Sequence, residues 1–184
     1  MKKILVIFYI LLWIISYCWA GKLKCTDIHI VDGDTVRVMV SNGTITQQVK
    51  VRLAGIDTPE KYYTAKLYKD AKRCRIPPKQ MHELGLLATC ELYELLYKHD
   101  VYLDRLGIGK YRRVIGILYL KNGTNINYEM VKSGYACVYR YKLPNLTDDQ
   151  WKVLRSCQEY ARLNKKGLWA IDYDAMSCLC GYSE

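Results

Sequence analysis

One stretch of the sequence, VRLAGIDTPE at residues 51–60, combines an arginine on a predicted strand with two carboxylates. Arg52 lies in an alternating apolar pattern that predicts a half-buried strand, whereas Asp57 and Glu60 flank a Thr-Pro turn. A guanidinium binds a phosphate through two parallel hydrogen bonds, and a carboxylate can bind a metal ion or accept a proton. This arrangement is typical of a site for a metal ion and a phosphate. The alternative is a structural cluster of ion pairs at a strand end.

Two other stretches supply groups that complement the first. VDGDTV, residues 31–36, places Asp34 in a turn between two predicted strands, and GKYRRV, residues 109–114, places Arg113 at the start of another. Taken alone, a D-G-D turn is more often structural, and two adjacent arginines are more often solvated charges. The G-x-G-K sequence that ends at Lys110 lacks the spacing and the Ser or Thr of a phosphate-binding loop.

Together, the three stretches predict metal-assisted hydrolysis of a phosphodiester. The carboxylates of Asp34 and Asp57 and the backbone carbonyl of Thr58 offer oxygen ligands, which favour calcium or magnesium over zinc. Glu60 is expected to accept a proton from an attacking water or to orient that water.

Arg52 and Arg113 are expected to hold the phosphate in this mechanism. Arginine suits the task because its planar fork binds two oxygens and stays charged, whereas lysine is only a point charge. Two such groups stabilise the additional negative charge of a five-coordinate phosphorus.

The elements that must position these residues predict a small α+β fold. Between residues 25 and 53, branched apolar residues recur at every second position, which predicts strands, and Asn42-Gly43 predicts a hairpin turn. Residues 101–106 and 113–120 are two further strands. Several short strands followed by a mixture with helices favour an antiparallel sheet closed into a barrel.

Three helices are predicted around this sheet. Residues 79–98 carry apolar residues on one helical face, and residues 125–133 form a short helix that Gly134 ends. A capping box at residues 147–150 begins a third helix, which Gly167 ends.

Two segments fall outside this pattern. Residues 61–79 form a polar excursion rich in Lys and Tyr, and Trp169 is expected to dock on the core. Residues 170–184 form a tail with Cys178 and Cys180, which is either stapled by a disulfide or loose.

The first twenty residues predict a secretory signal. Two lysines precede an unbroken apolar run over residues 4–15, and Cys18 and Ala20 are small residues at the positions that a signal peptidase recognises. We therefore expect export to the periplasm or the extracellular space. An uncleaved leader would instead anchor the chain in the membrane.

The composition is consistent with an exported protein that meets a polyanion. The 28 Lys and Arg against 18 Asp and Glu give a net charge of +10, which suits nucleic acid, although many exported proteins are basic. Cysteines in an oxidising compartment usually pair, and seven follow the leader, so at least one stays free. Zinc is disfavoured because the three histidines are scattered and no pair of C-x-x-C motifs is present.

The sequence resembles the staphylococcal nuclease (thermonuclease) family. The motifs VDGDTV, VRLAGIDTPE, KYRRVIGILYL, INYEMVKSGYACVY and KKGLWA occur in that family's order and rough spacing, over about residues 25–169. The resemblance implies a five-stranded antiparallel OB-type β-barrel with about three α-helices, with residues 21–169 as the nuclease domain. It also implies a calcium-dependent nuclease that acts on DNA and RNA and leaves 3′-phosphate ends. No obligate protein partner is evident, and we expect a monomer.

The resemblance assigns roles to nine residues of this sequence. Calcium ligands are expected at Asp34, Asp57 and Thr58. Catalytic roles are expected at Arg52, Glu60 and Arg113. Contacts with the substrate are expected at Tyr111, Tyr139 and Tyr141, where aromatic faces stack on bases.

Three features depart from the family pattern. Arg112 stands where the family usually has glycine, and the strand that follows favours Arg113 as the catalytic arginine. Residues 61–79 differ from the prototype, which can alter substrate entry. The cysteines are also foreign to the prototype, and one candidate disulfide joins Cys74 to Cys90, which flank the start of the long helix.

Two other functional classes are alternatives. The same barrel can serve as a catalytically inactive module that binds nucleic acid, or the chain can be a membrane-anchored surface protein whose basic face meets anionic lipid. Inactive domains of this family lose the acids or arginines first. All of them are present here, which favours an enzyme.

Overall fold

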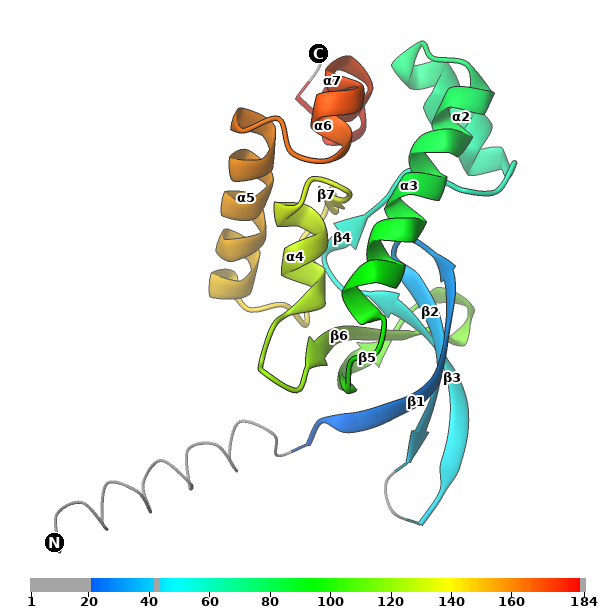
Figure 1. Ribbon diagram of the computed structural model, residues 1–184, viewed down its shortest axis with the longest axis vertical. Coiled ribbons are helices and arrows are strands. Elements are labelled where there is room, and N and C mark those ends of the chain that lie inside the picture. The colour runs from blue at the N-terminus through cyan, green and yellow to red at the C-terminus, as the bar shows by residue number, and fades with distance from the viewer. Residues whose placement is uncertain (1–20, 42–43, 183–184) are drawn as a thin grey trace, which may run out of the picture.

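The computed structural model describes residues 21–41 and 44–182, so the predicted leader and the predicted turn at residues 42–43 lie outside the described residues. A closed barrel has the strand order β1-β2-β3-β6-β5 (Figure 1). Its strands are β1 (Leu23–Asp32), β2 (Thr35–Ser41), β3 (Thr46–Leu53), β5 (Val101–Ile108) and β6 (Val114–Leu120). Successive side chains point to opposite faces of a strand, and the inward positions are apolar and buried: Val36, Val38, Val40, Val51 and Leu53. The predicted five-stranded barrel is confirmed.

One pairing differs from the predicted antiparallel sheet. Neighbouring strands of the barrel are antiparallel except β3 and β6, which run parallel with Val51 opposite Val114. A parallel pair needs a long crossover, which the chain between these strands provides with two helices and β5. The parallel contact also matters for the site. It places Arg113, which precedes Val114, next to the strand that carries Arg52.

The three predicted helices are confirmed as α3 (Pro78–Leu96), α4 (Ile126–Lys132) and α5 (Asp148–Leu163). The capping box is present at the start of α5. Leu92 from α3, Met130 from α4 and Leu154 from α5 join the inward-facing barrel residues in one apolar core. No helix within the described parts of the chain is both long and apolar enough to cross a membrane.

The polar excursion at residues 61–79 contains a helix that the sequence analysis did not predict, α2 (Ala65–Cys74). The Thr64 side chain accepts a hydrogen bond from the Leu67 amide and so caps this helix. Only Leu67 and Ala71 are buried on α2, and they pack with Met81 of α3 in a small separate cluster. With so few apolar positions in ten residues, hydrophobic periodicity gives little signal for a helix.

The C-terminal tail is folded and stapled. It forms α6 (Leu168–Ile171) and α7 (Tyr173–Leu179), and Trp169 is buried against Ala175 and Met176, as expected for a residue that docks on the core. In Figure 1, α7 lies at the same end of the molecule as α2.

The disulfides correct the candidate pairing of Cys74 with Cys90. Cys74 of α2 bonds instead to Cys178 of α7, and Cys137 bonds to Cys180. Cys90, on α3, is free and exposed. Both disulfides therefore tie the C-terminal tail to earlier parts of the chain.

Candidate active site

Asp34 and Arg52 form the buried base of the site. Asp34 lies in the turn before β2 and is only 6% exposed. Its carboxylate accepts hydrogen bonds from the Thr35 hydroxyl at 2.9 Å and from the Thr58 amide at 3.1 Å, and it contacts Arg52 Nη1. Arg52 Nη2 lies 2.6 Å from Asp57 Oδ1. One guanidinium therefore bridges two carboxylates that come from different segments of the chain.

The position of Asp57 depends on a short strand outside the barrel. β4 (Ile56–Asp57) pairs with β7 (Cys137–Val138), so that Asp57 lies opposite Cys137. The corner before β4 is fixed by Asn127, a buried residue of α4 whose side-chain amide donates to the Ala54 carbonyl at 2.9 Å. A buried amide with satisfied hydrogen bonds restrains the backbone strongly, because breaking those bonds would leave polar groups without partners.

Glu60 is held by a close approach between its backbone and helix α3. A Cβ atom on Gly85 would lie 2.5 Å from the Glu60 carbonyl oxygen, so only glycine allows α3 to pack this closely. Gly33, in the turn before Asp34, similarly leaves room for Thr58, whose hydroxyl would lie 2.9 Å from a Cβ at that position. Gly85 thus brings two backbone segments together, and Gly33 makes room for a side chain, next to the carboxylates.

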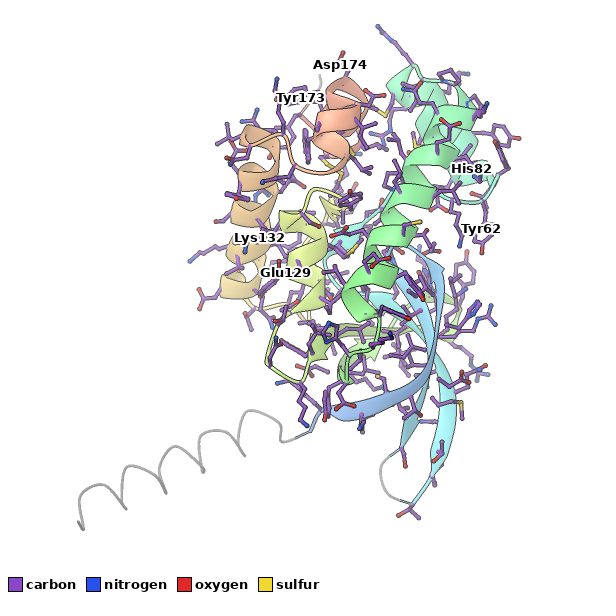
Figure 2. The ribbon with its side chains drawn as sticks, in the orientation of Figure 1. Tyr62, His82, Glu129, Lys132, Tyr173 and Asp174 are labelled. Atoms are coloured by element: carbon purple, nitrogen blue, oxygen red, sulfur yellow. A yellow bond between two sulfur atoms is a disulfide. The ribbon has the colours of Figure 1, made fainter. Side chains whose placement is uncertain are left out.

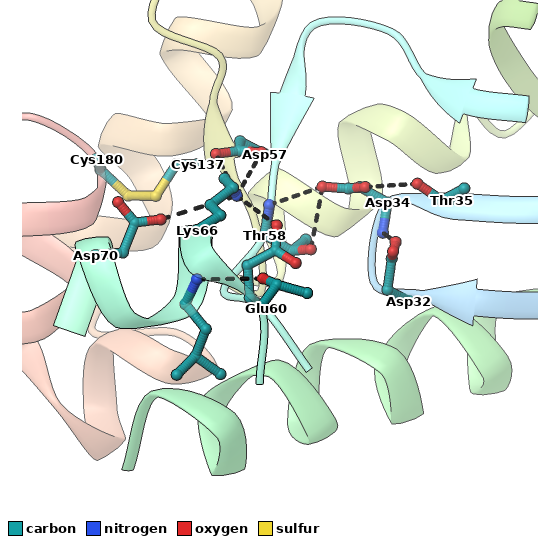
Figure 3. A network of polar contacts seen from close by, with 12 residues as sticks. Asp32, Asp34, Thr35, Asp57, Thr58, Glu60, Lys66, Asp70, Cys137 and Cys180 are labelled. Carbon is teal, nitrogen blue, oxygen red and sulfur yellow. Dashed lines mark hydrogen bonds and ion pairs between the residues drawn. A yellow bond between two sulfur atoms is a disulfide. The ribbon is translucent and has the colours of Figure 1, made fainter. Parts of the chain in front are cut away.

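Lys66 completes a network that the sequence analysis missed (Figure 3). Its ammonium lies 2.7 Å from Glu60 Oε1, 3.3 Å from Asp57 Oδ2 and 3.9 Å from Asp70 Oδ2. Burial alone lowers the pKa of Lys66, but these three carboxylates outweigh burial and raise the pKa. Lys66 lies in the first turn of α2, where the helix dipole disfavours a cation. The carboxylates are therefore what hold the ammonium there.

Arg113 differs from Arg52 because no acid pairs with it in the described residues. It follows a short 3₁₀ turn, η1 (Lys110–Arg112), and its Nε is buried without a hydrogen-bond partner. The guanidinium carbon lies 6.0 Å from the centre of the Tyr111 ring, which is itself highly exposed. Arg112 is exposed, whereas Arg113 is half-buried. Of the two adjacent arginines, the one with a buried, unpaired donor is thus the one that the sequence favoured.

Tyr139 and Tyr141 follow β7 and form a second group. Their ring centres lie 6.3 Å apart in an edge-to-face arrangement, and the Tyr139 amide donates to the Gly55 carbonyl at 2.8 Å. Among the contacts of the described residues, none joins these rings to Tyr111 or to Arg113. The structure therefore brings the acids and Arg52 together, and leaves the three tyrosines at the periphery.

The acidic residues fit a hard divalent cation. Asp34 and Asp57 are already bridged by one cationic group, Arg52, so their carboxylates are close enough to share a metal ion. The Thr58 carbonyl would be a third oxygen ligand, and oxygen ligands suit Ca²⁺ or Mg²⁺. No group of three or more His, Cys, Asp or Glu side chains converges on one point in residues 21–41 and 44–182. Two carboxylates and a carbonyl would leave at least half of the coordination shell to water and substrate.

Comparisons with known proteins match this geometry to a family. The model of the staphylococcal nuclease homologues matches residues 50–171. The chain belongs to the staphylococcal nuclease family. An uncharacterized endonuclease of Haemophilus influenzae is 31% identical over 92% of this chain and 79% of its own length. One from Escherichia coli is 32% identical over 88% of this chain and 89% of its own length, and a micrococcal nuclease of Shigella flexneri is 30% identical over 78% and 71%.

Within the staphylococcal nuclease family model, the matched segment contains every expected site residue except Asp34, which precedes it. Sequence reasoning missed three residues of this family member that position the site: Lys66, Gly85 and Asn127. The Thr64 cap was the one available signal for Lys66, because a helix that starts there puts Lys66 and Asp70 on one face. Gly85 and Asn127 act through contacts with distant segments, which a local pattern does not reveal.

Proposed function

We propose that the chain is a calcium-dependent nuclease that hydrolyses phosphodiester bonds in DNA and RNA and leaves 3′-phosphate ends. The observation that carries the proposal is the buried, unpartnered Nε of Arg113, which directly precedes the strand adjacent to the one that holds Arg52. A buried guanidinium donor without an acid favours an anionic ligand. The names of the relatives, endonuclease and micrococcal nuclease, support a phosphodiester as that anion.

Two arginines would bind the phosphate. Arg113 would donate to it directly, since no carboxylate in the described residues competes for its guanidinium. Arg52 has five N–H donors, and its two carboxylate partners leave some of them for a phosphate oxygen. Both groups stay cationic as negative charge grows on the oxygens around phosphorus, so they stabilise the transition state.

Glu60 would act on the attacking water. Its carboxylate would accept a proton while the water oxygen bonds to phosphorus, and the bond from phosphorus to the 5′ oxygen would break. The 5′ oxygen would take up a proton from solvent water and leave as a hydroxyl, so that the phosphate stays on the 3′ side. Calcium held by Asp34, Asp57 and the Thr58 carbonyl would supply Lewis-acid stabilisation of the phosphate oxygens.

Cleavage of fluorophore-quencher oligonucleotides tests this proposal. DNA and RNA versions are incubated with the protein in calcium and then with a chelator, alongside Glu60→Gln. Calcium-dependent cleavage that the variant loses would support the assignment. Tight binding without cleavage in calcium, magnesium and manganese would contradict it, and would indicate the inactive nucleic-acid-binding module.

We also propose that the protein is exported through residues 1–20. This proposal rests on the basic start and apolar run of the sequence. Fractionation of the producing cells, with the mass of the mature chain, tests it. Activity in the cytoplasmic fraction, on a chain that keeps its leader, would contradict export.

A further inference from the structure

A cluster of aromatic side chains next to the site has no role in the mechanism above. Tyr62, Tyr63 and Tyr68 are each about half exposed, at 50%, 52% and 52%. The Tyr63 ring stacks on His82 with ring centres 4.8 Å apart and an angle of 24° between the planes, and it lies 6.2 Å from Tyr68. We name these four residues the α2 platform. Figure 2 shows Tyr62 and His82 on the side of the molecule that α2 and α3 form.

Hydrogen bonds hold two residues of the platform, Tyr62 and His82, in place. The Tyr62 hydroxyl donates to the Val31 carbonyl at 3.1 Å, and the His82 ring bonds through Nδ1 to the Lys61 carbonyl. Rings that are fixed before a ligand arrives lose little conformational entropy on binding. The flat faces are thus presented to solvent at low cost.

The charge around the platform suits a polyanion. Residues 61–79 contain seven basic residues and one acid, Asp70. Lys66, Arg73 and Lys79 have carboxylate partners, whereas no ion pair of the described residues involves the other four, Lys61, Lys69, Lys72 and Arg75. Alternation of basic and aromatic side chains is typical of surfaces that follow a nucleic-acid backbone and stack its bases.

A second exposed tyrosine pair allows a comparison with the platform. Tyr93 and Tyr97 of α3 also stack, with ring centres 5.2 Å apart, and are 49% and 47% exposed. Their neighbours in the sequence include the acids Glu91 and Glu94. This pair has one cation against it, Lys98, whose ammonium lies 4.9 Å from the centre of the Tyr97 ring. Tyr93, which the two acids flank in the sequence, supplies the matched control.

The platform also adjoins the proposed catalytic centre. Tyr62 follows Glu60 by two residues, and its partner Val31 precedes Asp34 by three. Tyr68 lies on α2, the helix that carries Lys66 into the carboxylate network. A strand whose phosphate is bound at the site would have neighbouring nucleotides within reach of these rings.

We propose that the α2 platform stacks unpaired bases of single-stranded nucleic acid next to the phosphate at the active site. The inference rests on the proposed function, because it assumes that a nucleic acid binds there. Stacking on a ring face requires bases that are not enclosed in a duplex, so the platform favours single strands. It would strengthen binding of a chain of several nucleotides and would not contribute to a substrate with only one base.

The test measures binding and cleavage separately. Binding of a short fluorescent single-stranded oligonucleotide is followed by anisotropy in a Glu60→Gln background, with Tyr63→Ala and Tyr68→Ala combined. Loss of two stacking faces should weaken binding on the order of tenfold or more. Tyr63→Phe should keep the affinity, because the ring face remains. Tyr93→Ala should leave it unchanged.

Cleavage of a p-nitrophenyl ester of a thymidine phosphate, in the otherwise unaltered protein, gives the second readout. The Tyr63→Ala, Tyr68→Ala variant should keep kcat/KM for this single-base substrate. Three results would each contradict the proposed role of the platform. They are unchanged affinity for the oligonucleotide in the double variant, an equal loss of affinity for duplex DNA, and an equal loss of kcat/KM on the ester. Absence of cleavage in the unmodified protein would contradict the proposed function alone, since the binding measurements still decide whether the platform stacks bases.

Discussion

The two sides of the candidate site are held by different forces. Asp34 lies in the turn between β1 and β2, and Arg52 lies on β3; the inward residues of these strands belong to the main apolar core. Lys66 and Asp70 stand on α2, which buries only two of its own side chains and is tied by Cys74 to α7. The barrel side is therefore positioned by hydrophobic burial, whereas the α2 side depends on a covalent link.

This difference follows from how much apolar surface each side can bury. Burial contributes about 25 cal/mol for each Å² of apolar surface, so a strand in the barrel core gains far more than a helix with two buried residues. Small elements with little core are commonly fixed by disulfides. Asp57 depends on both a strand pairing and a covalent link, because β4 pairs with β7, and Cys137 of β7 bonds to Cys180.

The largest expected effect comes from the barrel side. Arg113→Ala should lower kcat by about 10²–10³-fold, the loss typical for removing one donor to a transition-state oxyanion. The fold should survive, because the described residues show no ion pair that the substitution would break. Steady-state kinetics on DNA, with circular dichroism to monitor folding, checks both statements. Arg112→Ala is the matched control and should change kcat little, and a larger loss there than at Arg113 would reverse the assignment.

Breaking the covalent link should affect the α2 side selectively. Replacing Cys74 and Cys178 together by Ser removes a crosslink that spans 104 residues, and should lower the free energy of unfolding by about 2–4 kcal/mol. Hydrogen exchange should accelerate in α2 and α7 before it does in β2 and β3. Uniform acceleration across the barrel would show that the two sides are not held independently.

Gly85→Ala tests the close contact between α3 and the backbone of Glu60. The new methyl group would press on the Glu60 backbone, which should lower stability by about 1–3 kcal/mol and displace the proposed base. Chemical denaturation and kcat should both register the change. Leu86→Ala, at an exposed neighbour on the same helix, is the control. Normal kcat in a Gly85→Ala protein that is measurably destabilised would mean that Glu60 does not depend on this close approach.

Asp34 and Arg52, which the sequence predicted, and Lys66, which it missed, lie on opposite sides of the site. Asp34 and Arg52 could be found because strand alternation and turn residues are local signals, and the parallel register then brings Arg113 near them. Lys66 and the partner of Cys74 could not be found in this way. Their positions depend on how α2 packs against α3 and α7, which involves residues about a hundred positions away.

The smallest effect concerns the free thiols, which report on each region without disturbing it. Burial raises the pKa of Cys25, on β1, to about 12, whereas Cys90 is exposed on α3. The native state therefore keeps the Cys25 proton between its ordinary pKa of 9.0 and about 12, while the unfolded chain releases it. Stability should consequently fall as pH rises through that window, and Cys25→Ala should weaken this dependence.

Iodoacetamide at mildly alkaline pH should label Cys90 rapidly and Cys25 only on unfolding, because the thiolate is the reactive form. Mass spectrometry measures the labelling of each thiol. Equal labelling rates for Cys25 and Cys90 would show that the barrel opens as readily as the helical side.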